Sequence, residues 1–232
     1  MNWLYLTINL ASIAVPFAFS FENRTKFYKK WFALFPALFI TAAFFVVWDF
    51  WFTAEGIWQF NPKYVLGIYL VNLPIEEWIF FLFIPYSCVF IHESLKHFFP
   101  ISPFYKYGKT VALILGSICI LISLINTQHL YTTVTFLLLG ILLFLNVFVF
   151  KVKFLGSFFF TYLVSIIPFC VVNGILTAMP ILIYNDAENL GIRIGTIPLE
   201  DFFYSMLMLL MNITIFEFLL ARQIKNGISN FK

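Results

Sequence analysis

Residues 74–81 read PIEEWIFF, and residues 198–205 read PLEDFFYS. The two stretches are 198 − 74 = 124 positions apart, and at this offset residues 49–93 align without a gap with residues 173–217. Matches at this offset are Leu66-Gly67-Ile68 with Leu190-Gly191-Ile192, Thr53 with Thr177, Asn61 with Asn185, Glu93 with Glu217, and Asp49 with its near-isostere Asn173. The chain is therefore predicted to contain two copies of one structural unit.

The composition predicts an integral membrane protein. Of 232 residues, 62% are hydrophobic and only 11% are charged, which is too apolar for a soluble domain of this length. Helices are expected because open strands would leave backbone groups unpaired in lipid, and the apolar runs lack a period-2 pattern. Seven runs are each long enough, at about 20 residues, to cross the hydrocarbon core; they are 3–21, 31–53, 74–94, 109–126, 130–150, 154–178 and 198–221.

The repeat and the seven runs together predict an all-α membrane fold with seven transmembrane helices. Four crossings, an even number, separate the first run of one copy from the first run of the other, so both copies have the same orientation in the membrane. The arrangement is two parallel three-helix repeats joined by a connector helix, or 3+1+3. We expect the first repeat over residues 1–95, the connector over 96–129 and the second repeat over 130–232.

The basic residues predict the orientation in the cell (inner) membrane. With the N-terminus outside and the C-terminus in the cytoplasm, only Lys63 and Arg193 lie outside. The twelve inner-face residues are Arg24, Lys26, Lys29, Lys30, Lys96, Lys106, Lys109, Lys151, Lys153, Arg222, Lys225 and Lys232. The first run lacks the features of a signal peptide and is expected to be a retained span. The 14 basic and 11 acidic residues form no single basic patch, so no nucleic-acid partner is expected.

Five acidic residues lie at the outer ends of predicted helices, where an ionised acid costs up to roughly 2.5–3.5 kcal/mol if it reaches the membrane core. They are Asp49, Glu76, Glu77, Glu200 and Asp201. Acids that follow proline are also ordinary at helix starts, so a purely structural role is the alternative. A pseudo-twofold relation between the copies would bring both acidic pairs to one cavity, where burial and mutual repulsion keep a carboxyl group protonated. Such a group is a general acid toward an apolar substrate.

Within each pair we expect the first acid to act directly and the second to tune it. Glutamate occupies the first position in both copies, at Glu76 and Glu200, whereas the second position is Glu77 in one copy and Asp201 in the other. A group that must reach one substrate carbon needs a fixed length, and a neighbour that shares a proton does not.

Aromatic residues follow both acidic pairs. Trp78, Phe80 and Phe81 follow the first pair, and Phe202, Phe203 and Tyr204 follow the second. Aromatic faces stabilise a carbocation by roughly 0.5–2 kcal/mol each. The alternative is an interfacial aromatic belt, which explains many tryptophans and tyrosines at helix ends.

The inner ends of the runs show no metal-ligand spacing. Glu93 and Glu217 lie 17 residues (93 − 76 = 17) beyond the first acid of each pair, or about 25 Å along a helix, so they cannot share the outer site. We expect them to pair with inner-face Lys29, Lys30 or Arg222. The cysteines and histidines are expected to be structural; they are Cys88, Cys119, Cys170, His92, His97 and His129.

At the acidic pairs the sequence resembles the small membrane lycopene beta-cyclases of bacteria and archaea, whose two halves occur as separate subunits or fused, and the cyclase portion of the fungal bifunctional enzyme. The resemblance covers nearly the whole chain. Its most specific features are the Pro-x-Glu-Glu/Asp element of each half, Asp49 with Thr53, and Asn173 with Thr177. It implies the fused form of the enzyme, with lycopene or a related carotenoid as substrate and a redox-neutral cyclisation to beta rings.

The resemblance implies no flavin or nicotinamide cofactor, because the flavin-dependent cyclases are unrelated and have a dinucleotide fold. The nearest glycine string, from Gly191 to Gly195, lacks the GxGxxG pattern. The ring type, the number of ends cyclised, the length of the carotenoid and the formation of a homo-oligomer stay open at this stage.

Two alternatives from other functional classes are a seven-helix transporter and a membrane prenyltransferase. A transporter for a polar solute needs more polar groups along the mid-membrane path than the runs contain, and the last run has no lysine for a retinal Schiff base. A prenyltransferase needs a metal-binding Asp-x-x-x-Asp element, which Asp186 and Glu188 only faintly resemble.

The charge pattern predicts that reporter fusions after Lys106 and after Lys151 will report the same, cytoplasmic face of the membrane. A fusion at Lys63 should report the opposite face. Fusions that place Lys106 and Lys151 on opposite sides would contradict the seven-span topology.

Overall fold

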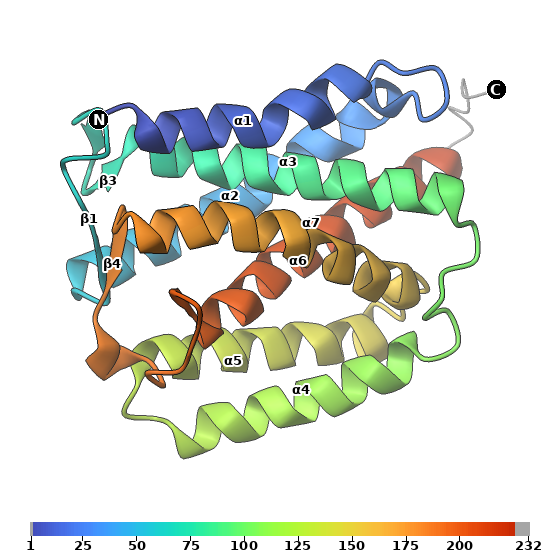
Figure 1. Cartoon of the computed structure of the whole chain (residues 1–232). Helices are drawn as coiled ribbons and strands as arrows, with labels where there is room; N and C mark the ends of the chain where they lie inside the picture. The colour runs from blue at the N-terminus through green and yellow to red at the C-terminus, as the bar shows by residue number, and fades with distance from the viewer. Residues whose placement is uncertain (1, 226–232) are drawn as a thin grey trace.

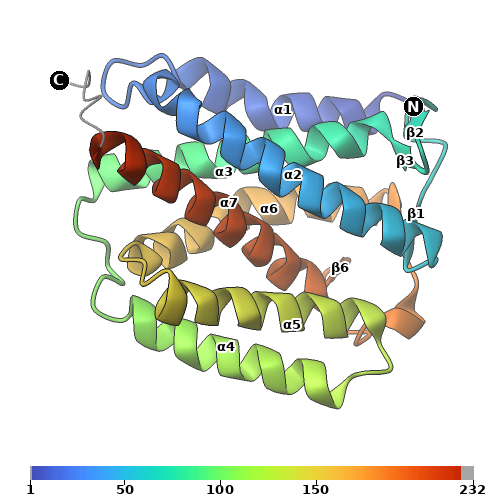
Figure 2. The same ribbon diagram turned by 180° about the vertical axis from the view of Figure 1, so that it is seen from behind.

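The apolar runs fold into seven α-helices that lie side by side in one bundle (Figures 1 and 2). The computed structural model describes residues 2–225. The helices in this part of the chain are α1 (Leu4–Phe19), α2 (Trp31–Ala54), α3 (Ile75–Phe98), α4 (Gly108–Ile125), α5 (Leu130–Phe144), α6 (Leu155–Ala178) and α7 (Leu199–Lys225). Each corresponds to one of the apolar runs.

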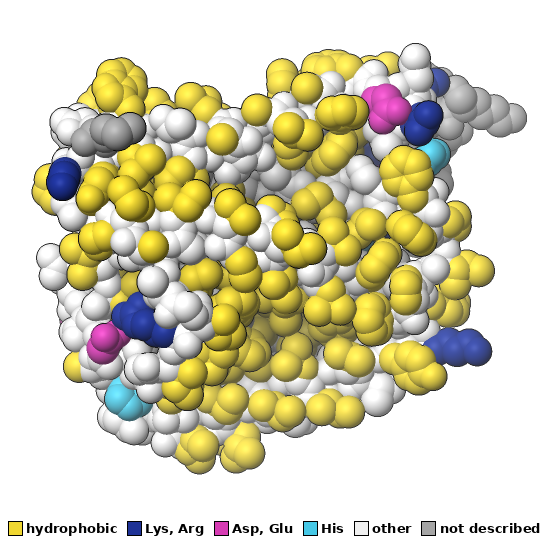
Figure 3. All heavy atoms as spheres, in the orientation of Figure 1, with side chains coloured by type: hydrophobic (Ala, Val, Ile, Leu, Met, Phe, Trp, Pro, Cys, Tyr) yellow, Lys and Arg dark blue, Asp and Glu magenta, His cyan; other side chains and the backbone are white. Residues whose placement is uncertain are grey.

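Six helices among the described residues are long and apolar enough to cross a membrane. These are α2 with its preceding 3₁₀ turn η1 (Phe27–Lys30), α3, α4, α5 with a following π-helical turn η2 (Leu145–Val149), α6 and α7. Helix α1 has 16 residues and is a shorter apolar helix. In Figure 3, hydrophobic side chains cover the middle of the visible face, and charged ones lie toward the two ends of the helices. This is the surface of an integral membrane protein.

The helices of the two copies pack in equivalent ways. Helix α1 packs on α3 as α5 packs on α7, and the two copies meet where α2 contacts α7 and α3 contacts α6. Helix α4 packs mainly on α5, at one side of the bundle (Figure 1). The core between the helices is strongly aromatic, with Phe45, Phe52, Phe136, Phe158 and Phe216 fully buried.

Short strands organise the loops at one end of the bundle, called the outer end here after the predicted orientation, and the opposite end is called the inner end. The apolar runs gave no sign of these strands. They are β1 (Trp58–Phe60), β2 (Tyr69–Leu70), β3 (Leu73–Pro74), β4 (Leu182–Tyr184), β5 (Arg193–Ile194) and β6 (Ile197–Pro198). The β2–β3 and β5–β6 hairpins directly precede α3 and α7 and turn at equivalent positions. Gly195 has φ +66° in the second hairpin, and Val71 has φ +61° in the first, a conformation that only glycine adopts without a steric cost.

The β1–β4 pair lies on the pseudo-twofold axis between the copies. The strands are antiparallel, and Gln59 opposes Ile183, its own equivalent at the offset of 124 (183 − 59). Flanking backbone bonds are reciprocal: Asn61 N–H donates to the Ile181 carbonyl at 2.9 Å, and Asn185 N–H donates to the Ile57 carbonyl at 2.8 Å. The two bonds join equivalent residues, with donor and acceptor exchanged between the copies. The outer loops therefore connect the two halves symmetrically.

A buried ion cluster joins the copies at the inner end. The Lys96 ammonium lies 2.9 Å from a carboxylate oxygen of Glu93 and 2.5 Å from one of Glu217, which are equivalent residues of the two copies. Lys30 also pairs with Glu93, as expected from the sequence. His92, which belongs to the same cluster, contacts Glu217 at 3.0 Å. The cluster holds two carboxylates and two ammonium groups, so its charges compensate.

Two glycines let the beginning of α4 cross the beginning of α6. A Cβ atom at Gly156 would lie 2.6 Å from the Phe104 carbonyl oxygen, and one at Gly108 would lie 2.5 Å from the backbone nitrogen of Gly156. At Gly174, also in α6, the nearest atom to an added Cβ is 4.0 Å away.

We expect Gly156→Ala to lower the unfolding free energy in detergent by about 1–3 kcal/mol, because rigid backbone blocks the added methyl group. Gly174→Ala is the matched control in the same helix and should be neutral or stabilise by up to about 1 kcal/mol. Equal stability of the two variants would show that α4 does not depend on this close crossing.

Candidate active site

The outer ends of α2, α3, α6 and α7 enclose a buried cavity of about 70 Å³. Asp49, Glu77, Asn173 and Asp201 all lie on its wall, and each is less than 10% exposed. Asp49 and Asn173 are equivalent in the repeat, as are Glu77 and Asp201. The two copies thus contribute matching positions to one cavity.

Asp201 receives three hydrogen bonds from neutral groups. The Tyr131 hydroxyl donates to Oδ1 at 2.6 Å, while the Asn173 amide and the Tyr184 hydroxyl donate to Oδ2 at 2.5 Å and 2.7 Å. Tyr184 lies in β4, where burial, and then the nearby Asp201 carboxylate, raise its pKa well above the ordinary value. Its phenol therefore stays protonated and remains a donor, so the Asp201 carboxylate is held by a full set of donors.

The first copy differs from the second in the number of carboxyl groups on the cavity wall. It contributes Asp49 and Glu77, whereas the second contributes the Asn173 amide and the Asp201 carboxyl group. Tyr5 donates to Glu77 Oε2, and the Trp58 indole donates to Asp49 Oδ1. Asp49 and Glu77 also repel each other electrostatically, since both line the same apolar wall. Thr53, one helical turn after Asp49, lies beside the same carboxylate.

Glu76 and Glu200 point away from the cavity, because adjacent positions on a helix diverge by roughly 100°. The Oε1 atom of each accepts a backbone N–H from the preceding loop, Leu66 at 2.6 Å and Leu190 at 2.8 Å. Thr132 also donates to Glu200 at 2.7 Å. The expectation that the first acid of each pair acts directly is not supported by this geometry: the second acid faces the cavity, and the first holds the loop.

Two of the six aromatic residues expected around the acids line the cavity, namely Phe80 and Tyr204. The Tyr204 ring centroid lies 5.0 Å from that of Trp48 and 6.2 Å from that of Trp58, so it belongs to a continuous aromatic wall. The expected residues that do not line the cavity are Trp78, Phe81, Phe202 and Phe203. They lie behind the wall and pack against neighbouring helices.

The threonines of the predicted substrate-binding set also lie off the wall. The Thr177 hydroxyl bonds to the Asn173 carbonyl at 2.9 Å and to the Thr196 hydroxyl at 2.6 Å, so it joins α6 to the following loop. Thr53 is not on the cavity wall either. Both positions support the wall from behind.

Two tyrosines that bind the acids were not predicted from the sequence. Tyr5 and Tyr131 play equivalent roles at the starts of α1 and α5, but they are 131 − 5 = 126 positions apart. An ungapped comparison at offset 124 does not align them. A second comparison that allows the first helix of each copy to shift by two residues would have found the pair.

One further group of ligand-type side chains among the described residues consists of His92, Glu93 and Glu217. It lies at the inner end, away from the cavity. Its carboxylates already bind Lys30 and Lys96, and His92 bonds to Thr161 at 2.8 Å. Each of these three side chains thus has a partner within the protein.

Residues 2–95 and 128–219 match the family model described as Lycopene cyclase. The chain belongs to the lycopene cyclase family. The match consists of two segments, one for each copy of the repeat, as expected for a fused two-repeat lycopene cyclase. Comparison with curated proteins found no match, and comparison with solved structures found none either.

Both matched segments contribute acids to the cavity, and Asp49 belongs to the first. Glu77 lies in the first segment and Asp201 in the second, whereas α4 falls between them. The family membership supports activity as a carotenoid cyclase in the membrane. The cavity is the place where the two family segments meet around carboxyl groups.

The hydrogen bonds to Asp201 predict that Tyr131→Phe lowers the unfolding free energy by about 1–3 kcal/mol, because a buried carboxylate loses one donor. Tyr105→Phe is the control, since Tyr105 is 69% exposed and lies outside the cavity. Unfolding of both variants in detergent measures the difference. Equal stability would indicate that the Tyr131 bond contributes nothing net.

Proposed function

We propose that this lycopene cyclase converts the acyclic ends of lycopene, or of a related carotenoid, to beta rings by an acid-initiated, redox-neutral cyclisation. Glu77, assisted by Asp49, is the acid, and Asp201 is the base. The observation that carries the proposal is one cavity whose wall holds all three of these buried carboxyl groups, with neutral donors and aromatic rings around them.

The reaction moves one proton in and one proton out. An acid protonates C2 of the terminal alkene, which leaves a tertiary cation at C1. The C5–C6 double bond attacks C1, so the C1–C6 bond forms and the cation moves to C5. Loss of the C6 proton forms the new C5–C6 double bond. Product and substrate have the same composition, so the proposed reaction consumes no oxidant or reductant.

The first copy is suited to hold the incoming proton. Asp49 and Glu77 share one apolar wall, where two negative charges repel strongly because little water screens them. One proton shared between them removes the repulsion and leaves a carboxylic acid in contact with the cavity. Their partners Tyr5 and Trp58 are neutral, so no positive charge competes with that proton.

The second copy is suited to receive the proton. Three donors stabilise Asp201 as a carboxylate, and a carboxylate beside a carbocation is both a base and a counter-charge. The rings of Phe80 and Tyr204 on the same wall add cation–π stabilisation of roughly 0.5–2 kcal/mol each without a basic atom pointing at C5.

The proposed topology has seven membrane spans, with α1–α3 and α5–α7 as the repeats and α4 as the connector. In the cell membrane, with the N-terminus outside, the cavity lies toward the outer leaflet and the Lys96 cluster toward the cytoplasm. An apolar carotenoid dissolved in the bilayer can then reach the cavity without entering water.

The two acids that faintly resemble a prenyltransferase motif, Asp186 and Glu188, bind groups of the protein itself. Asp186 lies in the 3₁₀ turn η3 (Asp186–Glu188), where its carboxylate pairs with Arg193 at 2.5 Å and its side chain is 62% exposed. Glu188 accepts the Leu130 N–H at 3.0 Å. Both acids are used within the outer loops and not in a diphosphate site.

Expression in a lycopene-accumulating bacterial host should yield carotenoids with beta rings, identified by pigment extraction and chromatography. Glu77→Gln should lower conversion by about 10²–10⁴-fold at equal protein level, because glutamine keeps the size and polarity but cannot give the proton. Asp201→Asn should lower it similarly. The matched controls are the adjacent Glu76→Gln and Glu200→Gln, which should lower the folded yield and not the turnover of folded protein.

The residual product separates the two roles. With Asp201→Asn, the C5 cation can lose a proton from C4 or from its methyl group, so the residual product should contain other ring isomers. With Glu77→Gln, the residual product should keep the parental ring type. If Gln at 77 and Asn at 201 both leave normal conversion, the cavity carboxylates are structural and the proposed mechanism is wrong.

A further inference from the structure

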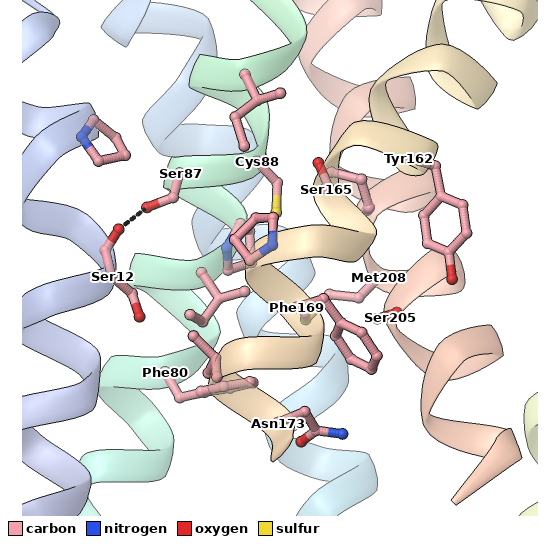
Figure 4. A pocket seen from close by; sticks show the side chains of 17 residues that line it. Ser12, Phe80, Ser87, Cys88, Tyr162, Ser165, Phe169, Asn173, Ser205 and Met208 are labelled. Carbon is pink, nitrogen blue, oxygen red and sulfur yellow. Dashed lines mark hydrogen bonds between the residues drawn. The ribbon is translucent and has the colours of Figure 1, made fainter. Parts of the chain in front are cut away.

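A second, larger cavity lies next to the carboxylate cavity, toward the middle of the bundle. It has a volume of about 240 Å³ and lies between α1, α3, α6 and α7 (Figure 4). The two cavities share six wall residues, so they adjoin each other; the six are Phe80, Ile84, Phe169, Asn173, Ser205 and Met208. On the side of the bundle surface this larger cavity is bounded by α1 and α6. Val15 and Ile167, which precede the lining residues Pro16 and Pro168 in these helices, are 62% and 71% exposed.

The wall of this larger cavity behaves as apolar although it contains serines. The Ser87 hydroxyl bonds to the Ser12 carbonyl at 3.0 Å, as Figure 4 shows, and to the Phe83 carbonyl at 2.9 Å. The Ser205 hydroxyl donates to the Phe202 carbonyl at 2.9 Å. The hydroxyl protons of Ser87 and Ser205 are thus used on the backbone, whereas Ser165, also on the wall, lies beside the Cys88 thiol and has no backbone acceptor. The wall is mainly apolar, with Ser165 as its one serine that is not bonded to the backbone. Such a wall fits a hydrocarbon.

The equivalent place in the other half is filled. At the offset of 124, Val172 corresponds to Trp48 and Ser205 corresponds to Phe81. Trp48 and Phe81 are 4% and 1% exposed, and the Phe45 ring lies 5.6 Å from Trp48 and 6.1 Å from Phe81. Large aromatic side chains thus occupy the position that small residues leave open between α3, α6 and α7.

We infer that the protein has one hydrocarbon channel, between α1, α3, α6 and α7, which admits one end of one polyene from the bilayer, and that Trp48 and Phe81 close its pseudo-symmetric copy. The inference rests on the proposed function for the identity of the polyene. A volume of about 240 Å³ lies below the roughly 300–1,000 Å³ of pockets that enclose whole ligands, so an end group enters while the rest of the chain stays in lipid.

The inference is tested by transplanting the aromatic residues of the closed side to the open side. Val172→Trp copies Trp48, and Ser205→Phe copies Phe81. Each is made in the full chain with Glu77→Gln, so that lycopene accumulates unconverted in a lycopene-producing host. After purification in detergent, the absorbance of total carotenoid per protein measures retention. Val172→Ala in the channel and Ser117→Phe on the exposed face of α4 are the matched controls.

Val172→Trp and Ser205→Phe should lower retained lycopene by about tenfold or more, equivalent to about 1.4 kcal/mol of binding free energy. Both controls should retain it at the parental level. If Val172→Trp does not fold, as judged by size-exclusion chromatography, the smaller Val172→Phe should still lower retention. Folded Val172→Trp and Ser205→Phe proteins that both retain parental amounts of lycopene would overturn the single channel.

Failure of this inference differs from failure of the proposed function. The channel is tested by the total carotenoid retained, whatever its chemical form, whereas the function is tested by conversion in the parent chain. A parent chain that retains lycopene, loses it with Val172→Trp and never cyclises it would support the channel and contradict the proposed reaction. If the parent chain cyclises lycopene, and the Val172→Trp and Ser205→Phe variants cyclise it equally well, the proposed reaction is supported and the single channel is contradicted.

Discussion

A carboxyl group that leaves water must find its donors inside the protein, and this constraint organises both ends of the bundle. At the inner end the donors are charged: Lys96 compensates Glu93 and Glu217 together. At the outer end the donors to the cavity acids are phenols, an indole and an amide, all neutral. Ion pairs fix the inner carboxylates as anions and leave them no chemistry. Neutral donors hold the outer ones in place and still allow a proton to come and go, so the outer end alone is suited to acid–base catalysis.

Much of the fold followed from the sequence because its signals are local. The length of each apolar run predicted the helices, because backbone groups in lipid must pair within the segment or in a closed barrel. The match at offset 124 predicted the repeat. The short strands were missed because two- and three-residue segments carry no period. The proposed orientation in the membrane rests on charge counting alone, because the fold itself is compatible with either direction.

The candidate site was only partly predictable. The acidic pairs are evident in the sequence, but two neighbouring acids differ by roughly 100° around the helix, and the rotation that turns Glu77 and not Glu76 inward is set by packing. The hydrogen bonds of Leu66 and Leu190 to the first acids belong to loop geometry that no spacing encodes. The equivalence of Tyr5 and Tyr131 was not predicted because the first helices of the two copies are shifted by two residues relative to the offset of 124.

Differences between the copies make one site out of a symmetric frame. A strict twofold would give two identical acids and two identical channels, yet a cyclisation needs one group that gives a proton and another that takes it. Asp49 and Asn173 occupy equivalent positions, so the number of carboxyl groups differs between the copies, and in the proposed mechanism this difference decides which copy holds the proton. Trp48 and Val172 also occupy equivalent positions, and under the inference of a single channel this difference decides on which side of the bundle a hydrocarbon enters. In the proposed mechanism the same backbone thus supports the acid in one half and the base in the other, and the inferred channel brings the polyene end between them.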